Sequence, residues 1–133
     1  MKALSVRAPW WWFILHRGKD IENRDWGTQH RGTIYLHAGK WWSLKGVNDG
    51  CYDATGMGAL AFGSVFPVDR EEMQAGCGCI VGKVDLVDCV KRSNSPWFVG
   101  EYGFVLRNPV AFPNPIPLKG TLGFFDVPDG LAP

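Results

Sequence analysis

The chain has 133 residues, of which 46% are hydrophobic, and its formal net charge is +1. This length and composition suffice for one domain with one core, so we expect a single domain over residues 1–133. The near-neutral charge excludes a global basic field, so any contact with nucleic acid has to be local and small. Apolar runs are too short for a membrane span and the N-terminus lacks a signal-peptide core, so we expect a cytoplasmic protein without a membrane partner.

The cysteines predict no cofactor. They are Cys51, Cys77, Cys79 and Cys89. Two of them form Cys-x-Cys rather than the Cys-x-x-Cys spacing of common zinc sites. Without a secretory signal, disulfides are not expected, and free cysteines are among the most buried residues. We therefore expect buried free thiols and neither a metal nor another cofactor.

The N-terminal part of the chain alternates strands with a helix. Residues 3–6 (ALSV) predict a strand. Pro9 suits the first turn of a helix, and Gly18 is a plausible stop for it. Residues 20–24 (DIENR) predict a short strand, and 32–38 (GTIYLHA), with threonine, isoleucine, tyrosine and leucine, predict another.

The rest of the chain is less regular. Residues 41–52 predict a second helix, whereas residues 53–69 are rich in glycine, lack periodicity and predict a loop. Residues 78–91 carry many β-branched side chains and form the best strand candidate. Residues 102–113 and 122–128 predict two more strands, joined by a proline-rich turn.

Together these elements predict the class of fold. Seventeen glycines and nine prolines favour short strands and frequent turns over a helix bundle. A count of about six strands and two helices is typical of a small β-barrel with helices packed on it. We therefore predict a mixed α+β fold that is mainly β, a closed or nearly closed barrel.

A dense charged cluster, KDIENRDW, lies between two apolar segments at residues 19–26. On an alternating strand, Glu22 and Arg24 lie on the face opposite Ile21. Lys19 comes where the preceding helix turns into that strand, so we expect Lys19, Glu22 and Arg24 to point into one solvent-accessible cavity. The alternative is an exposed edge strand whose ion pair contributes less than about 1 kcal/mol.

The order and spacing of several motifs resemble the ASCH domain, a member of the PUA-like superfamily. The family's motifs are a Ser–x–Arg–x–Pro–Trp start, a Gly–x–Lys–x–x–Glu–x–Arg string, and an Arg–Gly before a strand that ends in His–Ala. The matching residues are Ser5, Arg7, Pro9, Trp10, Lys19, Glu22, Arg24, Arg31, Gly32, His37 and Ala38. Residues 101–128 are similar to the family's terminal pair of strands, and the glycine-rich middle is unmatched. Arg17 stands where the motif has its glycine, and Gly18 is displaced by one position.

The resemblance implies a PUA-like β-barrel with a cleft beside the charged motif, in a family generally thought to bind RNA or nucleotide-like ligands. A few relatives act as acetylcytidine amidohydrolases or as ribonucleases. In the amidohydrolases a threonine stands where this chain has Glu22. This difference weakens the prediction of amidohydrolase activity. Fold alone does not decide between these functions.

Nine residues are our candidates for ligand binding. Arginine and lysine side chains can hold a phosphate, tryptophans can stack a base, and Glu22 can orient the basic groups or accept from a base amine. Of the tryptophans we favour Trp26, because it follows the charged strand in a turn; the others can equally be core. The nine candidates are Ser5, Arg7, Trp10, Lys19, Glu22, Arg24, Trp26, Arg31 and His37.

Two classes of function follow. The first is a module that binds RNA, which we expect to be single-stranded, or a nucleotide, without turnover. The second is a small hydrolase of RNA or of an acylated or modified nucleoside, with Glu22 as general base, Lys19 as nucleophile or proton carrier, and Arg24 stabilising developing charge. The sequence shows no Ser–His–Asp set, metal-ligand cluster or phosphate-binding glycine loop, so we favour binding. The oligomeric state stays open.

Overall fold

The computed structural model describes residues 1–39 and 69–131. The helix expected at 41–52, nearly all of the loop expected at 53–69, and Cys51 lie outside these residues. Across the described ranges, no helix is both long and apolar enough to cross a lipid bilayer.

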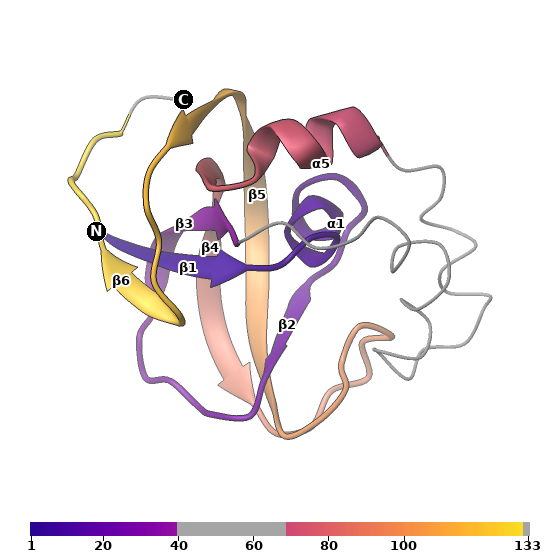
Figure 1. Cartoon of the computed structure of the whole chain (residues 1–133). Helices are drawn as coiled ribbons and strands as arrows, with labels where there is room; N and C mark the ends of the chain where they lie inside the picture. The colour runs from indigo at the N-terminus through magenta and orange to yellow at the C-terminus, as the bar shows by residue number, and fades with distance from the viewer. Residues whose placement is uncertain (40–68, 132–133) are drawn as a thin grey trace.

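One six-stranded sheet organises the described chain (Figure 1). Its strand order is β2-β5-β4-β3-β1-β6. The pairings are antiparallel except for β1 with β3, which run parallel. The strands are β1 (Lys2–Val6), β2 (Ile21–Arg24), β3 (Gly32–Ala38), β4 (Cys79–Val90), β5 (Tyr102–Pro117) and β6 (Phe124–Asp126). The prediction of a mixed fold that is mainly β is therefore confirmed.

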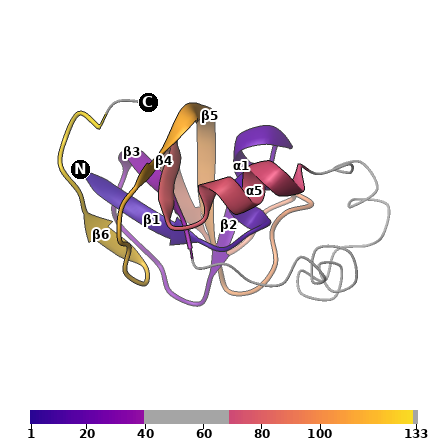
Figure 2. The same cartoon turned by 45° about the horizontal axis from the view of Figure 1, so that its top comes forward.

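Two short helices pack together beside the sheet, α1 (Trp10–His16) and α5 (Arg70–Gly76) (Figure 2). Trp11 and Trp12 of α1 are buried, so the triple tryptophan is largely core. Gly76 lets the helices approach, because a β-carbon there would lie 2.8 Å from the Trp11 ring. His16 Nε2 of α1 lies 2.9 Å from Glu72 Oε1 of α5, which adds a polar contact between the helices.

The sheet curls into a half-barrel around an aromatic cluster. Phe104 of β5 and Phe124 of β6 stack with ring centroids 5.9 Å apart, although these strands are not neighbours in the sheet. Trp26, just after β2, packs edge-on against both rings, at 5.2 Å and 5.7 Å. The two edge strands, β2 and β6, are thus brought together by side-chain packing.

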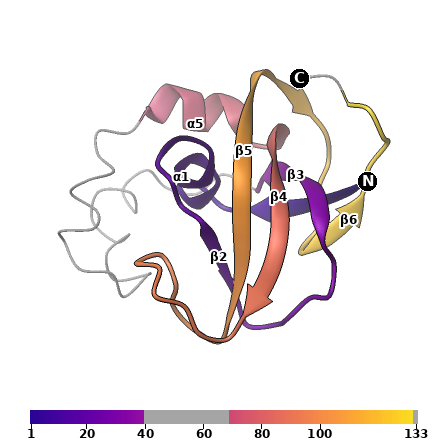
Figure 3. The ribbon, with the colours of Figure 1, turned by 180° about the vertical axis from the view of Figure 1, so that it is seen from behind.

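The structure differs from the sequence prediction around β5. The proline-rich segment is not a turn: it is the second half of β5, the long strand beside β4 in Figure 3. β2 pairs with β5 only as far as Val105, so Pro109, Pro113 and Pro115 lie where β4 is the only paired neighbour in the described sheet. Proline is tolerated there because that edge of the strand needs no N–H donor.

The strand after β5 and one helix also differ from expectation. β6 does not pair with β5, as a joined pair of strands would; it pairs with β1 on the far side of the sheet. Helix α5 was not predicted, because seven residues are too few for a periodic signal. Its N-cap is visible in the sequence: Asp69 accepts a hydrogen bond of 2.9 Å from the Glu72 backbone N–H.

Candidate functional site

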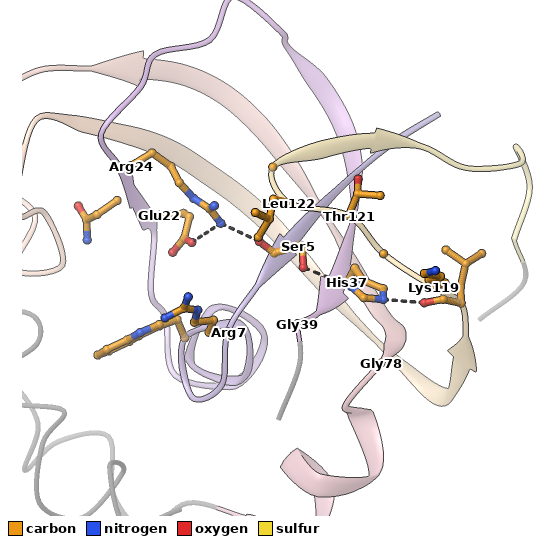
Figure 4. A pocket seen from close by; sticks show the side chains of 15 residues that line it. Ser5, Arg7, Glu22, Arg24, His37, Gly39, Gly78, Lys119, Thr121 and Leu122 are labelled. Carbon is orange, nitrogen blue, oxygen red and sulfur yellow. Dashed lines mark hydrogen bonds and ion pairs between the residues drawn. The ribbon is translucent and has the colours of Figure 1, made fainter. Parts of the chain in front are cut away.

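A cavity of about 790 Å³ opens between β1, β2, β3 and the segment that joins β5 to β6 (Figure 4). Among the described residues that line it, the charged side chains are three cations and one carboxylate, Arg7, Arg24, Lys119 and Glu22. The cavity therefore concentrates positive charge on a chain whose net charge is only +1. The remaining lining residues are Ser5, Trp10, Asn23, His37, Gly39, Gly78, Leu118, Gly120, Thr121, Leu122 and Gly123.

Glu22 and Arg24 form a paired unit on one wall of the cavity. The alternation of β2 holds as predicted: Ile21 is in the core, and Glu22 and Arg24 face the cavity. Arg24 Nη2 donates to Glu22 Oε2 at 2.8 Å and to the backbone carbonyl of Ser5 at 2.8 Å. The second bond ties β2 to β1, so the guanidinium is fixed by partners on two strands.

Lys19 lies behind this pair rather than in the cavity. Its ammonium donates to Glu22 Oε1 at 3.1 Å and to the backbone carbonyl of Ile21, and the side chain is only 3% exposed. Burial lowers the pKa of Lys19, while the Glu22 carboxylate opposes that shift. The expectation that all three charged groups share one cavity is wrong for Lys19, because its partners hold it on the core side of Glu22.

The displaced glycine of the motif still makes the turn into β2. Gly18 has φ +73°, a left-handed conformation that follows the C-terminus of α1. Arg17, at the position where the family has glycine, has φ −130° and places its guanidinium 4.4 Å from the centre of the Trp12 ring. The local turn is therefore compatible with the shifted glycine.

A hydrogen-bonded chain runs from β1 through β3 to the segment after β5. Ser5 Oγ lies 3.4 Å from His37 Nδ1, and His37 Nε2 lies 2.7 Å from the Leu118 carbonyl oxygen. A carbonyl oxygen only accepts, so the neutral imidazole carries its proton on Nε2 and presents Nδ1 as acceptor to Ser5. His37 is buried, yet it lines the cavity.

The segment 118–123 supplies a wall that we did not predict. Its ends are held by backbone bonds, Leu118 N–H to the Gly78 carbonyl at 3.2 Å and Ser5 N–H to the Gly123 carbonyl at 3.3 Å. Gly120 packs on His37 so closely that a β-carbon there would overlap the imidazole. Gly120, between Lys119 and Thr121, and Gly123 at the end of the segment are the only sequence signal, and they also suit an ordinary turn.

Six of the nine candidate residues line the cavity: Ser5, Arg7, Trp10, Glu22, Arg24 and His37. The other three candidates, Lys19, Trp26 and Arg31, do not line the cavity. Trp26 belongs to the aromatic cluster of the half-barrel, where packing accounts for its ring. Arg31 is exposed; its guanidinium donates to the carbonyls of Thr28 and His30 and lies 3.6 Å from Asp88.

Metal and thiol chemistry find no support in the described part of the chain. Residues 1–39 and 69–131 contain no group of three or more His, Cys, Asp or Glu that could hold a metal ion. Cys77, Cys79 and Cys89 are free, and Cys79 is buried. Burial raises the pKa of the Cys77 and Cys79 thiols, which disfavours the reactive thiolate.

The curled sheet, its two packed helices and the cavity beside β2 define a small PUA-like α+β domain. A family model described as the ASCH domain matches residues 4–102, and the chain belongs to this family. The matched range runs from within β1 through β4 and therefore includes the Lys19–Glu22–Arg24 cluster, whereas segment 118–123 lies beyond it.

Two relatives carry the name "Activating signal cointegrator 1". The protein from Mus musculus is 29% identical over 127 residues, and that from Homo sapiens is 30% identical over 132 residues. Each alignment covers 89% of this chain but 21% of the relative. The chain thus spans about a fifth of the length of these proteins.

Proposed function

We propose that this domain binds RNA or a nucleotide-like ligand in the cavity of about 790 Å³, without turnover. ASCH domains are PUA-like domains generally regarded as RNA-binding, and the family supports this class of ligand. The local excess of cations over Glu22 supports it independently, since a phosphate or a base carbonyl is attracted there.

The observation that carries the proposal is the arrangement of Arg24. Its Nη2 is already engaged by Glu22 and Ser5, whereas Nη1 makes no hydrogen bond to the described residues. Both oxygens of Glu22 are engaged as well, by Lys19 and by Arg24. This wall therefore offers a donor rather than an acceptor, and it favours a carbonyl or phosphate oxygen of the ligand over an exocyclic amine.

Trp10 provides an apolar surface in the same cavity. It begins α1, packs edge-on against Phe13 with centroids 5.8 Å apart, and is only partly buried. A base that stacks on an aromatic side chain gains about 1–3 kcal/mol. The cavity thus combines a fixed cationic donor with an aromatic face, the two features that hold a nucleotide.

The test is binding of fluorescein-labelled RNA pentamers at low salt, measured by anisotropy. Arg24→Gln should weaken binding about tenfold or more, because a charge-assisted bond is lost from a partly enclosed site. The matched control is Arg92→Gln, since Arg92 is exposed and lies outside the cavity. Absence of binding to any RNA or nucleotide by the wild type, or equal losses in both variants, would contradict the proposal.

A hydrolase is the second candidate, and the Ser5–His37 pair is the observation that favours it. In that reaction Ser5 Oγ attacks the acyl carbon of an acylated nucleoside, and its proton passes to His37 Nδ1. The bond to the nucleoside nitrogen breaks, and the leaving amine takes the proton from His37. Water then hydrolyses the acyl-serine. Glu22 is a poorer general base here, because two cations already engage its oxygens.

Hydrolysis of acylated cytidines, followed by chromatography, separates the two candidates. We expect no turnover above the buffer rate. Turnover that is abolished by Ser5→Ala or His37→Gln, and kept in the control Ser93→Ala at an exposed serine, would replace the binding proposal by the hydrolase.

A further inference from the structure

Two cations stand on opposite sides of the cavity mouth. Arg7 follows β1, and Lys119 belongs to segment 118–123. Figure 4 shows them on either side of the Ser5–His37 pair. Both side chains are exposed, and neither makes an ion pair or side-chain hydrogen bond within residues 1–39 and 69–131.

The backbone on both sides of the mouth is held in place. The Arg7 carbonyl accepts from the Trp11 N–H at 3.3 Å, which ties that end of β1 to α1. Lys119 follows Leu118, whose N–H and carbonyl are both bonded, to Gly78 and to His37. The backbone positions from which the two cations extend are therefore set by the fold.

We propose that the cavity receives one base from within a single strand, and that the phosphates on its two sides lie on Arg7 and Lys119. This inference extends the proposed nucleotide binding and names the ligand as a single-stranded oligonucleotide rather than a free nucleotide. A base within a strand has one phosphate on each side, which matches one cation on each side of the Ser5–His37 pair, whereas a mononucleotide brings a single phosphate for the two cations. Leu122, 94% exposed at the same mouth, presents an apolar surface to a neighbouring base.

A duplex is disfavoured by the same geometry. The Arg24 donor and the Trp10 face lie within the cavity, so a base must leave its stack to reach them. Extruding a base from a duplex costs unpairing and unstacking free energy, which a base that is already single-stranded largely avoids. Among the described residues, Arg7 and Lys119 are the cations that face the mouth without an ion-pair partner, and two phosphate contacts do not offset that cost strongly.

The experiment measures affinity against ligand length and salt, with oligouridylates and oligoadenylates of one, two, three and five nucleotides. Affinity should rise about tenfold or more from the mononucleotide to the trinucleotide and little thereafter. Each phosphate contact to a single strand contributes about −0.7 to the slope of log K against log salt. The trinucleotide should therefore show a slope of about −1.4, reduced to about −0.7 in Arg7→Gln and in Lys119→Gln.

The control is Lys83→Gln, at an exposed lysine of β4 outside the cavity, which should keep the full slope. A mononucleotide that binds as tightly as the trinucleotide, unchanged slopes in Arg7→Gln and Lys119→Gln, or equal binding of a duplex would overturn this inference. The first two outcomes leave nucleotide binding in the cavity intact, provided that Arg24→Gln still weakens it. Loss of all binding by the wild type refutes the proposed function itself.

Discussion

Glu22 is held between two cations, one buried and one at the cavity wall. Lys19 and Arg24 occupy its two oxygens at 3.1 Å and 2.8 Å. Glu22→Gln keeps the shape but leaves Lys19 as a buried charge without its counterion. Removing one partner of a buried ion pair typically costs about 3–5 kcal/mol, and Arg24 is partly exposed, so we expect about 3 kcal/mol. Urea unfolding measures the loss in the free energy of unfolding, and Glu101→Gln at an exposed site is the control. A loss below about 1 kcal/mol would show that the cluster is still solvated.

Lys19 makes stability depend on pH in the alkaline range. Burial lowers the pKa of Lys19 in the folded protein, so the unfolded chain keeps this proton to a higher pH. The free energy of unfolding therefore rises with pH between the lowered pKa and the ordinary lysine pKa of about 10.4. Lys19→Met removes the titration, so the stability of the wild type relative to this variant should increase with pH across this window. A relative stability that falls over this range would contradict the assignment.

Segment 118–123 acts as one element because its glycine fits against His37. Gly120→Ala forces either the imidazole or the segment to move, since a β-carbon overlaps the ring. Overpacking of this kind costs about 1–3 kcal/mol, and ligand binding should weaken as Lys119 shifts with the segment. His37→Ala in the same chain should recover most of the loss, and a double-mutant cycle by urea unfolding measures that coupling. If the losses in the two single variants simply add in the double variant, the alanine at position 120 does not overlap the His37 ring.

The half-barrel depends, at the scale of the whole molecule, on the aromatic cluster between its edge strands. Phe124 of β6 contacts both Trp26, just after β2, and Phe104 of β5. β2 and β5 lie at the other edge of the sheet from β6. Phe124→Ala should destabilise the protein by about 3 kcal/mol, because the truncation leaves a cavity where β6 meets β2. Leu122→Ala, two residues earlier and 94% exposed, should change stability by less than about 0.5 kcal/mol. Similar losses in both variants would argue against packing as the link between the edges.

Local signals in the sequence were enough for most elements and for two of the three residues of the charged cluster, Glu22 and Arg24. Alternation in β2 predicted that Glu22 and Arg24 share a face opposite Ile21, and the structure pairs them as expected. The β-branched run of β4 and the proline at the start of α1 likewise identified their elements. These features depend on side-chain periodicity and turn chemistry, which are properties of neighbouring residues.

Tertiary structure alone decided which residues meet at the cavity and which do not. A lysine and a tryptophan fit a ligand site as well as the core, so the sequence does not place Lys19 or Trp26. The packing of the folded chain shows that they face the core. Lys119 reaches the cavity because β6 crosses the sheet to pair with β1, a contact between the two ends of the chain. The prolines of β5 are compatible with a strand only because β2 stops pairing at Val105. These side-chain positions and strand pairings depend on residues that are distant in sequence, so no local pattern predicts them.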